Sequence, residues 1–246
     1  MRIEIKKIAQ LVADKINRLP AGYVFTYLDI VNDADKNEAV IKALNRLVIS
    51  GKLKKISKGR FYKPEETPFG ELEPDEYQIA KDLLEKNGKI IGYLTGLSIY
   101  NKLGLTTQIS NIIQIGRNEF RSPLVRGKYK ISFILQKNAI NKKNIYLLQL
   151  LDSIRYFKNI PDSNIEFIFN RFRTLLSNLT DEQLKRFIRL LVKYPANTRA
   201  IAGALLDEIN QNKFADKIRL MQNPITVYKI GVTKEILSTA ENWNIK

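Results

Sequence analysis

The amino-acid sequence predicts an α+β protein that is mainly helical. Apolar residues recur at spacings of three and four along most of the chain, which is the pattern of amphipathic helices. Short runs rich in β-branched and aromatic residues, bounded by glycine, are typical of strands and occur within 53–64 and again within 111–136. The segments before residue 65 and after it differ in charge, so we also expect more than one domain.

An acidic stretch divides the chain at residues 65–76. It carries six acidic residues, no basic residue, two prolines and one glycine, a composition typical of a linker. Residues 1–64 hold 14 Lys and Arg against 6 Asp and Glu. We therefore expect a basic N-terminal domain at 1–64, an acidic linker at 65–76 and a C-terminal domain at 77–246.

The composition of the whole chain limits the chemistry that it can perform. Its 246 residues include 41 Lys and Arg against 25 Asp and Glu, a net charge of +16 that favours a polyanionic partner such as nucleic acid. The absence of Cys excludes disulfides, and the absence of His removes the commonest general base and most zinc sites. No apolar run approaches the roughly 18–20 residues of a membrane span, so we expect a cytoplasmic protein without membrane contact, metal or cofactor.

Three short segments open the N-terminal domain. The apolar spacing predicts a helix at about 3–19, which proline and glycine end. The β-rich run at 23–26 predicts a small strand. Thr26 precedes Asp29 by three residues, a capping-box pattern that predicts a short helix at about 27–32.

A third helix and a hairpin complete this domain. The helix is expected to begin near Asn37 and to end at Gly51, which suits a left-handed cap. Its apolar face is centred on Leu44 and comprises Val40, Ile41, Leu47 and Val48. Its opposite face carries Lys42, Asn45 and Arg46. The runs 53–57 and 60–64 are then expected to pair as a hairpin across a Lys-Gly turn.

The order helix, strand, helix, helix, strand, strand is that of a winged helix-turn-helix. A helix of this size fits the DNA major groove, and cations beside it can neutralise phosphates. The alternative interpretation of these cations is a solvated basic face without a partner. The candidate DNA-binding residues are Thr26, Tyr27, Lys36, Asn37, Lys42, Asn45, Arg46, Lys54, Lys55, Lys58, Arg60 and Lys63.

These candidates differ in their expected roles. The side chains of Asn45 and Arg46 suit the edges of adenine and guanine. Lys36 and Asn37, at the start of the helix, either contact phosphate or cap the helix. Tyr27 either contacts the DNA backbone or fills the gap between helices.

The C-terminal domain is predicted to combine helices with a small antiparallel sheet and to be helical towards its end. Helices are expected at 77–87, 92–105, 143–157, 180–195 and 197–209. Strands are expected at 111–116, 122–125 and 128–136. Thr180 and Gln183 form a second capping-box pattern. The aromatic residues interpreted as core rather than as base-stacking platforms are Tyr93, Tyr100, Phe167, Phe169 and Phe172.

A second basic surface is predicted on the helix within 180–194. Its members are Lys185, Arg186, Arg189 and Lys193, opposite an apolar face. These cations form either a solvated face or a docking surface for DNA or for an acidic partner.

Catalytic candidates are poor, and we expect a protein that is not an enzyme. Paired acidic residues at helix starts are explained by the helix dipole. The sequence has no Gly-rich phosphate loop, and its carboxylates lack the spacing of a metal site.

Three stretches carry a resemblance to a known family. Residues 22–30 and 42–64 have the pattern of a winged helix, with Leu44, Arg46, Leu47, Gly51, Gly59 and Tyr62 at the motif positions and Asn45 where small residues are common. Residues 92–109 contain "LGLTTQ", and residues 193–209 contain "YPANTRAIAGALL". In this order the stretches resemble the AbiEi-type antitoxins of bacterial type IV toxin–antitoxin (abortive infection) systems.

The resemblance implies more than the residues do. It implies a repressor that binds inverted repeats in its own promoter through residues 1–64, with self-association on DNA. It also implies a C-terminal domain that counters a nucleotidyltransferase toxin without requiring a stable complex. We therefore predict a DNA-binding antitoxin and autorepressor; the alternatives are an RNA-binding winged-helix accessory protein and a carboxylate-metal nuclease with a DNA-binding head.

Overall fold

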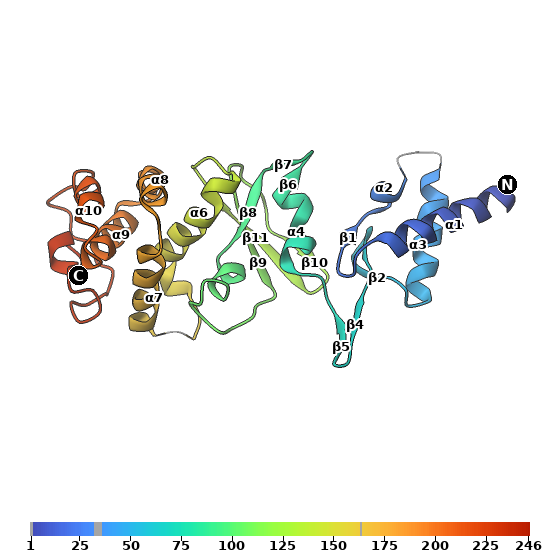
Figure 1. The fold of residues 1–246 in the computed structure, drawn as a ribbon, viewed down its shortest axis with the longest axis horizontal. Helices are drawn as coiled ribbons and strands as arrows, with labels where there is room; N and C mark the ends of the chain where they lie inside the picture. The colour runs from blue at the N-terminus through green and yellow to red at the C-terminus, as the bar shows by residue number, and fades with distance from the viewer. Residues whose placement is uncertain (1, 32–35, 163) are drawn as a thin grey trace. The chain divides into compact units, whose positions relative to one another are not determined.

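The computed structural model describes residues 2–31, 36–162 and 164–246, with side chains from residue 8 onward. The fold is α+β and divides into two compact units (Figure 1). The N-terminal unit comprises Met1–Lys81 and Val125–Tyr129, and the C-terminal unit comprises Asp82–Leu124 and Lys130–Lys246. Across the described ranges, no helix combines the length and apolarity needed to cross a membrane.

The N-terminal unit begins with the predicted order of elements. These are α1 (Arg2–Arg18), β1 (Val24–Phe25), α2 (Tyr27–Ile30), α3 (Asn37–Ile49), β2 (Lys54–Ser57) and β3 (Arg60–Tyr62). The strands form an antiparallel sheet in the order β1-β3-β2. The last residue predicted for the second helix, at position 32, lies outside the described residues. The other boundaries agree with the prediction to within a few residues.

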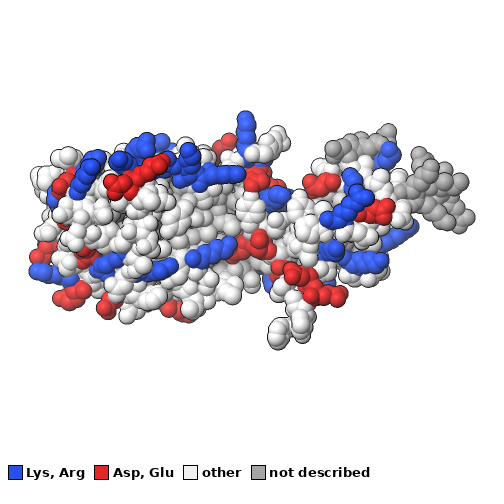
Figure 2. All heavy atoms as spheres, viewed as in Figure 1, with Lys and Arg blue, Asp and Glu red and all other residues white. Residues whose placement is uncertain are grey.

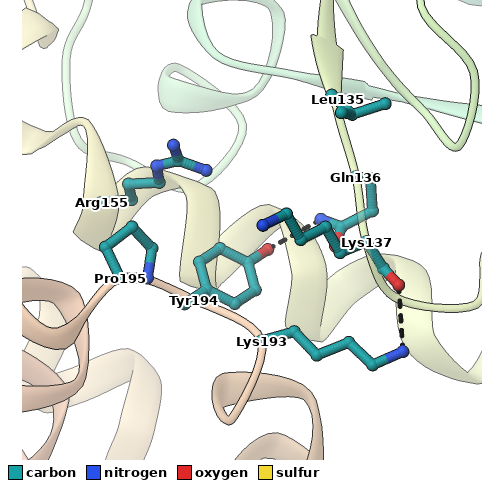
Figure 3. A pocket seen from close by; sticks show the side chains of 7 residues that line it. All are labelled: Leu135, Gln136, Lys137, Arg155, Lys193, Tyr194 and Pro195. Carbon is teal, nitrogen blue, oxygen red and sulfur yellow. Dashed lines mark hydrogen bonds between the residues drawn. The ribbon is translucent and has the colours of Figure 1, made fainter.

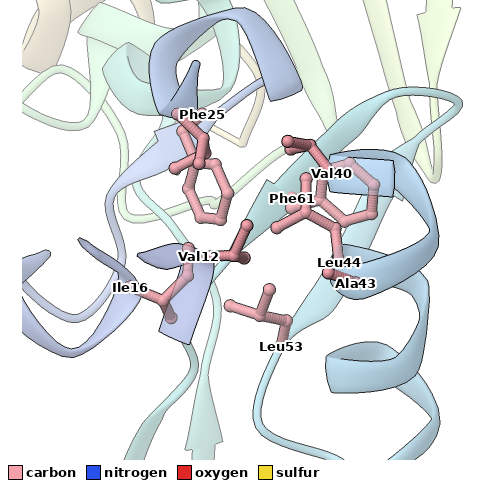
Figure 4. Packing of buried hydrophobic residues seen from close by; sticks show 9 residues of the cluster. Val12, Ile16, Phe25, Val40, Ala43, Leu44, Leu53 and Phe61 are labelled. Carbon is pink, nitrogen blue, oxygen red and sulfur yellow. The ribbon is translucent and has the colours of Figure 1, made fainter. Parts of the chain in front are cut away.

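The core of this part lies where α1 and α3 pack on the small sheet (Figure 4). Its buried residues are Val12, Ile16, Phe25, Ile30, Val40, Ala43, Leu44, Leu53 and Phe61. The prediction of a buried Ile41 is wrong, because its side chain is 37% exposed. Ala43 is buried instead, together with Val40 and Leu44.

Two glycines allow the sharp turns that bring α3 and the hairpin together. Gly51 has φ +76° and follows the last turn of α3, as the predicted left-handed cap requires. Gly59 has φ +75° between β2 and β3. Both backbone conformations favour glycine over any residue with a side chain.

The segment predicted as an acidic linker contains a hairpin. Strands β4 (Glu65–Thr67) and β5 (Gly70–Leu72) pair antiparallel, and the Thr67 hydroxyl donates to the Gly70 carbonyl at 2.7 Å. Gly70, with φ +112°, closes the turn. Composition alone pointed to a linker because the strands are acidic, but Thr67-Pro68-Phe69-Gly70 supplies turn residues that allow pairing.

The helix predicted at 77–87 is shorter than expected. Helix α4 covers Glu76–Leu84, and β6 (Glu85–Lys86) and β7 (Lys89–Ile90) follow as a hairpin. Asn87 and Gly88 both have positive φ, at 51° and 72°, which is the conformation of a tight two-residue hairpin turn. Asn87 and Gly88 therefore form the turn of a hairpin, in addition to following the end of a helix.

A four-stranded sheet in the order β10-β11-β9-β8 lies at the start of the C-terminal part of the chain. Its strands are β8 (Gly92–Thr95), β9 (Ile112–Arg117), β10 (Leu124–Arg126) and β11 (Tyr129–Leu135). Strands β8 and β9 are antiparallel, but β9 and β11 are parallel. The prediction of an antiparallel sheet is therefore only partly right. The chain passes from β9 to the outer strand β10 and returns between them as β11, so β11 runs in the direction of β9.

The prediction of a helix at 92–105 is right only for residues 97–100. Residues Gly92–Thr95 form β8, and only Leu97–Tyr100 form the short helix α5. A Cβ atom at Gly92 would lie 2.9 Å from the Leu83 carbonyl oxygen, so the strand depends on the close approach that glycine permits. Gly96, with φ +59°, separates the strand from the helix.

Helices form the rest of the C-terminal unit. They are α6 (Lys142–Arg155), α7 (Ile165–Ser177), α8 (Asp181–Leu191), α9 (Ala196–Glu208) and α10 (Asn212–Arg219), with short 3-10 turns at Phe157–Asn159 and Ala240–Trp243. The capping box predicted at Thr180 and Gln183 is confirmed at the start of α8. Helix α8 ends before Pro195 because the residue that precedes a proline disfavours the helical conformation.

Candidate functional site

The exposed face of α3 presents two of the predicted cations to solvent. Lys42 and Arg46 are exposed, and Lys42 forms an ion pair with Glu38 one turn earlier at 2.6 Å. The Lys42 ammonium lowers the pKa of the Glu38 carboxylate through this contact. Asn45 differs from the prediction, because it is half-buried and its Oδ1 atom is enclosed without a hydrogen-bond partner. Its oxygen therefore does not face the solvent as a base-reading group should.

The β2–β3 hairpin carries the second group of predicted cations. Lys55 and Lys58 are exposed, and the Lys55 ammonium lies 5.6 Å from the centre of the Phe61 ring. Arg60 and Lys63 are half-buried. Helix α3 and the hairpin belong to the same compact unit, over whose surface Figure 2 shows several Lys and Arg side chains.

Lys54 is bound by an acidic side chain that the sequence analysis had assigned to a linker. Its ammonium donates to the carboxylate of Glu71 on β5, and this contact raises the pKa of Lys54. Figure 2 shows a group of acidic side chains on the β4–β5 hairpin beside the cations of this unit. Lys54, which was predicted to bind phosphate, therefore already forms an ion pair with Glu71 of the same chain.

The remaining candidates lie at the start of α2 and of α3. The backbone N–H and the hydroxyl of Thr26 donate to the Asp29 carboxylate at 2.7 and 2.9 Å, as the capping-box pattern predicts. Tyr27 is half-buried against the core, which fits the gap-filling role. Lys36 is exposed immediately before α3, and Asn37 is half-buried in its first turn.

The structure divides the second predicted basic surface into two parts. Lys185 and Arg189 are exposed on α8. Arg186 forms an ion pair with Glu182 at 3.0 Å, so its charge is partly compensated. Lys193 lies beyond the end of α8, and its ammonium donates to the Lys137 carbonyl at 3.0 Å. Lys193 therefore faces a different site from the other three.

A buried polar network in the C-terminal unit was missed by the sequence analysis. Asp152 on α6 is only 1% exposed, and its carboxylate accepts three hydrogen bonds. Tyr93 and Thr95 donate to Oδ2 at 2.7 and 2.9 Å, and Tyr194 donates to Oδ1 at 2.7 Å. Strand periodicity explains two of these donors, since Tyr93 and Thr95 lie two residues apart and face the same side of β8.

An amide network extends this centre towards the surface. The Gln136 side-chain amide donates to the hydroxyls of Tyr93 and Tyr194 at 2.8 and 2.9 Å. Asn138 donates to the Gln136 side-chain oxygen at 3.1 Å and to the Leu190 carbonyl at 3.0 Å. Strand β11, helix α6 and the α8–α9 connection are thus joined by buried hydrogen bonds.

Burial governs the protonation of this network. It raises the pKa of Asp152 to about 6, although the hydroxyl donors oppose the change by stabilising the carboxylate. Burial and the nearby Asp152 charge both raise the pKa values of Tyr93, Tyr100 and Tyr194 above the ordinary tyrosine range. The tyrosines therefore remain hydrogen-bond donors and cannot act as bases near neutral pH.

The buried aromatic residues are mostly as predicted. Tyr93, Tyr100, Phe169 and Phe172 are buried, as expected for core residues. Phe167 is 52% exposed, so that prediction is wrong. It lies in the first turn of α7 on the side away from Phe169 and Phe172.

A pocket of about 290 Å³ opens beside the polar network (Figure 3). Its lining residues are Leu135, Gln136, Lys137, Arg155, Lys193, Tyr194 and Pro195. The pocket thus combines the outer edge of the buried network with three cationic side chains. In the part of the chain that the structure describes, no three acidic side chains come together as a metal site.

Comparisons with known proteins place the chain in a family and give one similar fold. The family model described as "Family of unknown function (DUF6088)" matches residues 11–209. The crystal structure of the Rv2827c protein from Mycobacterium tuberculosis is similar, with a TM-score of 0.58, 15% identity and coverage of 90% of this chain and 84% of that chain. A search of curated proteins finds no match. The structural likeness concerns the fold alone.

Proposed function

The chain belongs to the DUF6088 family, a family of unknown function, and we propose that it is a DNA-binding antitoxin and transcriptional autorepressor without enzymatic activity. In this proposal residues 1–64 form a winged helix-turn-helix that binds inverted repeats in the protein's own promoter, and protomers associate on the DNA. The protein acts in the cytoplasm, and its functional counterpart is a nucleotidyltransferase toxin with which it needs no stable complex.

One observation carries the DNA-binding part of the proposal. The exposed cations of α3 and of the β2–β3 hairpin belong to a single compact unit. A recognition helix needs an exposed polar face, and the hairpin of a winged helix needs cations that can reach the DNA phosphates. Arg46, Lys55 and Lys58 support this proposal, and Lys42 would contribute once phosphate displaces Glu38.

The geometry changes the roles assigned to individual candidates. Arg46 is exposed and suits the bidentate recognition of guanine, whereas the oxygen of Asn45 is enclosed. Lys54 contributes to DNA binding only if phosphate displaces Glu71. We therefore assign base recognition to Arg46 and phosphate contacts to Lys55 and Lys58.

The antitoxin part of the proposal is supported by the resemblance of residues 92–109 and 193–209 to AbiEi-type antitoxins. It is tested by expressing the chain together with a nucleotidyltransferase encoded beside it. Rescue of growth by the full chain, without co-purification of the two proteins, supports the proposal. Failure of the chain to restore growth contradicts it and leaves DNA binding to be judged separately.

Replacing Arg46 and Lys58 separates sequence recognition from general affinity. Arg46→Ala is expected to weaken binding to the promoter duplex by about 5- to 100-fold, the loss that follows from one bidentate base contact, with little effect on a scrambled duplex. Lys58→Ala is expected to weaken binding to both duplexes alike, since it contacts only phosphate. Fluorescence anisotropy with the two labelled duplexes at equal salt measures both effects.

Competition experiments complete this test. Unlabelled promoter duplex should displace the labelled duplex at lower concentration than tRNA does. A stronger effect of tRNA favours the RNA-binding alternative, and cleavage of plasmid in the presence of Mg²⁺ or Mn²⁺ favours the nuclease alternative. Equal losses on both duplexes for Arg46→Ala contradict base recognition by this residue.

A further inference from the structure

The cationic pocket of the C-terminal unit is independent of the proposed DNA-binding surface. Three segments that are distant in sequence supply its cations: Lys137 follows β11, Arg155 ends α6 and Lys193 follows α8. No acidic side chain is among the lining residues. The sequence analysis assigned no role to Lys137 or Arg155 and placed Lys193 on another surface.

None of the three cations of this pocket forms an ion pair with an acidic side chain of the described residues, although the Asp152 carboxylate interacts electrostatically with Arg155. Figure 3 shows the side chains of Lys137 and Arg155 extending towards the space beside the Tyr194 ring. Within the described ranges, neither side chain has an acidic group at ion-pair distance, and Arg155 instead lies over the Tyr156 ring at 4.8 Å. Like charges held close together repel one another, so a bound anion would stabilise the arrangement.

The floor of the pocket is fixed by the buried network. Tyr194 donates its hydroxyl proton to Asp152 and accepts a hydrogen bond from Gln136, which leaves its ring in one position. The Lys193 ammonium donates a hydrogen bond to the Lys137 carbonyl, which connects the segment after α8 with the segment after β11. A rigid floor lowers the entropy cost of ordering the site on binding.

The Asp152 carboxylate beneath the floor is the charge that opposes an anion. It does not line the pocket, and three hydroxyl donors from Tyr93, Thr95 and Tyr194 surround it. Its negative charge is therefore spread over hydrogen bonds within the protein, whereas the three cations line the pocket. The net charge of the residues that line the pocket is therefore positive.

We propose that this pocket binds the phosphate group of a small ligand, either inorganic phosphate or a phosphate monoester such as a nucleoside monophosphate. The planar guanidinium of Arg155 can donate two parallel hydrogen bonds to a phosphate, and the ammonium groups of Lys137 and Lys193 supply compact charges on either side. A volume of about 290 Å³ lies near the lower end of the range for ligand pockets, which suits a phosphoryl group with a small attached moiety.

Titration calorimetry of the full chain tests the proposal with three probes: inorganic phosphate, adenosine monophosphate and adenosine. We expect saturable binding of one phosphate-bearing probe per chain and no binding of adenosine. If inorganic phosphate and the nucleotide bind equally tightly, the pocket recognises the phosphate group alone. If the nucleotide binds more tightly, the pocket also contacts the nucleoside. Both outcomes support the proposal.

Variants locate the binding in the pocket. Arg155→Ala and Lys137→Ala are expected to weaken binding by about 10-fold or more, as for the loss of one charged hydrogen bond. Arg155→Lys should restore part of the affinity because it keeps the charge but loses the planar donor pair. The matched control is Lys185→Ala, an exposed cation of the same unit that does not line the pocket.

Three results overturn the proposal. They are the absence of saturable binding of either phosphate probe to the wild-type chain, equal weakening by Lys185→Ala, and unchanged affinity in both Arg155→Ala and Lys137→Ala. Circular dichroism of each variant verifies that the fold is kept, which is expected because the replaced side chains are exposed. A chain that binds a single-stranded oligonucleotide but neither phosphate probe also overturns the proposal, since the surface then belongs to nucleic acid.

Discussion

Replacing Asp152 with alanine is expected to lower the free energy of unfolding of the C-terminal unit by about 3–5 kcal/mol. The substitution removes the common acceptor of Tyr93, Thr95 and Tyr194, and it leaves these three buried hydroxyl donors without that acceptor. It also opens a cavity at a residue that is only 1% exposed. The loss is measured by denaturant unfolding followed by circular dichroism.

Single removal of a donor provides a graded comparison. Tyr93→Phe removes one hydrogen bond to the carboxylate but leaves two others, so we expect a loss of about 1–2 kcal/mol. The control is Glu66→Ala, which replaces an exposed carboxylate on β4 and should change stability by less than about 0.5 kcal/mol. A loss below about 1 kcal/mol for Asp152→Ala would contradict the view that this network holds the unit together.

The same carboxylate should make stability depend on pH in a defined direction. Burial raises the pKa of Asp152 from 3.8 to about 6, so the folded chain binds this proton more tightly than the unfolded chain. The resulting stabilisation is complete below pH 4 and is lost as pH rises through 6. Relative to Asp152→Asn, which is neutral at every pH, the wild-type protein should lose about 2 kcal/mol between pH 4 and pH 7.

Subtracting the two unfolding profiles isolates Asp152, because the other carboxylates titrate in both proteins. Several groups face the carboxylate and contribute to its pKa: Tyr93 and Thr95 from β8, Tyr194 before α9 and Arg155 from its own helix. A difference that stays constant from pH 4 to pH 7, or that changes in the opposite direction, would show that the carboxylate is not destabilised by burial.

Reversing two charges on the hairpin is expected to abolish most DNA binding. In Lys55→Glu/Lys58→Glu, two exposed cations become anions that repel phosphates. We expect affinity for any duplex to fall by about 100-fold or more, and the slope of log K against log salt to become shallower by about 2. Both lysines are exposed beyond the small core, so the fold should be kept.

The matched control places the same charge change on the other unit. Lys185→Glu/Arg189→Glu reverses two exposed cations of α8 and produces the same net charge. If the hairpin binds DNA, this control should retain nearly all affinity. Equal losses in the two double variants would mean that DNA senses only the total charge of the protein, and a larger loss in the control would assign DNA binding to the α8 surface.

The elements within residues 1–64 could be predicted well because their signals are local. Apolar spacing defines α1 and α3, and Gly51 and Gly59 occupy backbone positions that other residues adopt only with strain. A capping pattern located the start of α2 in the same way. The misassignment of Ile41 and Asn45 has a tertiary cause, because the packing of α1 and α2 on α3 decides which flank of its apolar face is covered.

Non-local structure accounts for what the sequence did not reveal in the C-terminal unit. The run 92–105 has helical spacing, but the pairing of β8 with β9 overrides it, and Gly92 and Gly96 provide the close contacts that pairing requires. Strand order also depends on contacts between distant residues, so no local sequence pattern indicates that β9 and β11 pair in parallel. The side chains around Asp152 come from positions 93, 95, 136 and 194, a spacing that no local pattern contains.

The partner of Lys54 illustrates the same limit at the candidate DNA surface. The sequence gives no indication that Lys54 on β2 has an acidic partner, but the β4–β5 hairpin places Glu71 beside it. The acidic composition of residues 65–76 indicated a change in the character of the chain, but not that Glu71 contacts the β2–β3 hairpin. A weaker contribution of Lys54 than of Lys55 or Lys58 to DNA binding follows from this contact.

Titration of the full chain with duplex DNA at increasing salt tests the central claim most directly. If the cations of α3 and the β2–β3 hairpin grip a duplex through about six phosphates, log K should fall against log salt with a slope near −5 between about 50 and 200 mM. The protein's own upstream DNA should bind more tightly than a random duplex. A chain that leaves every duplex unbound at about 50 mM salt would contradict the account.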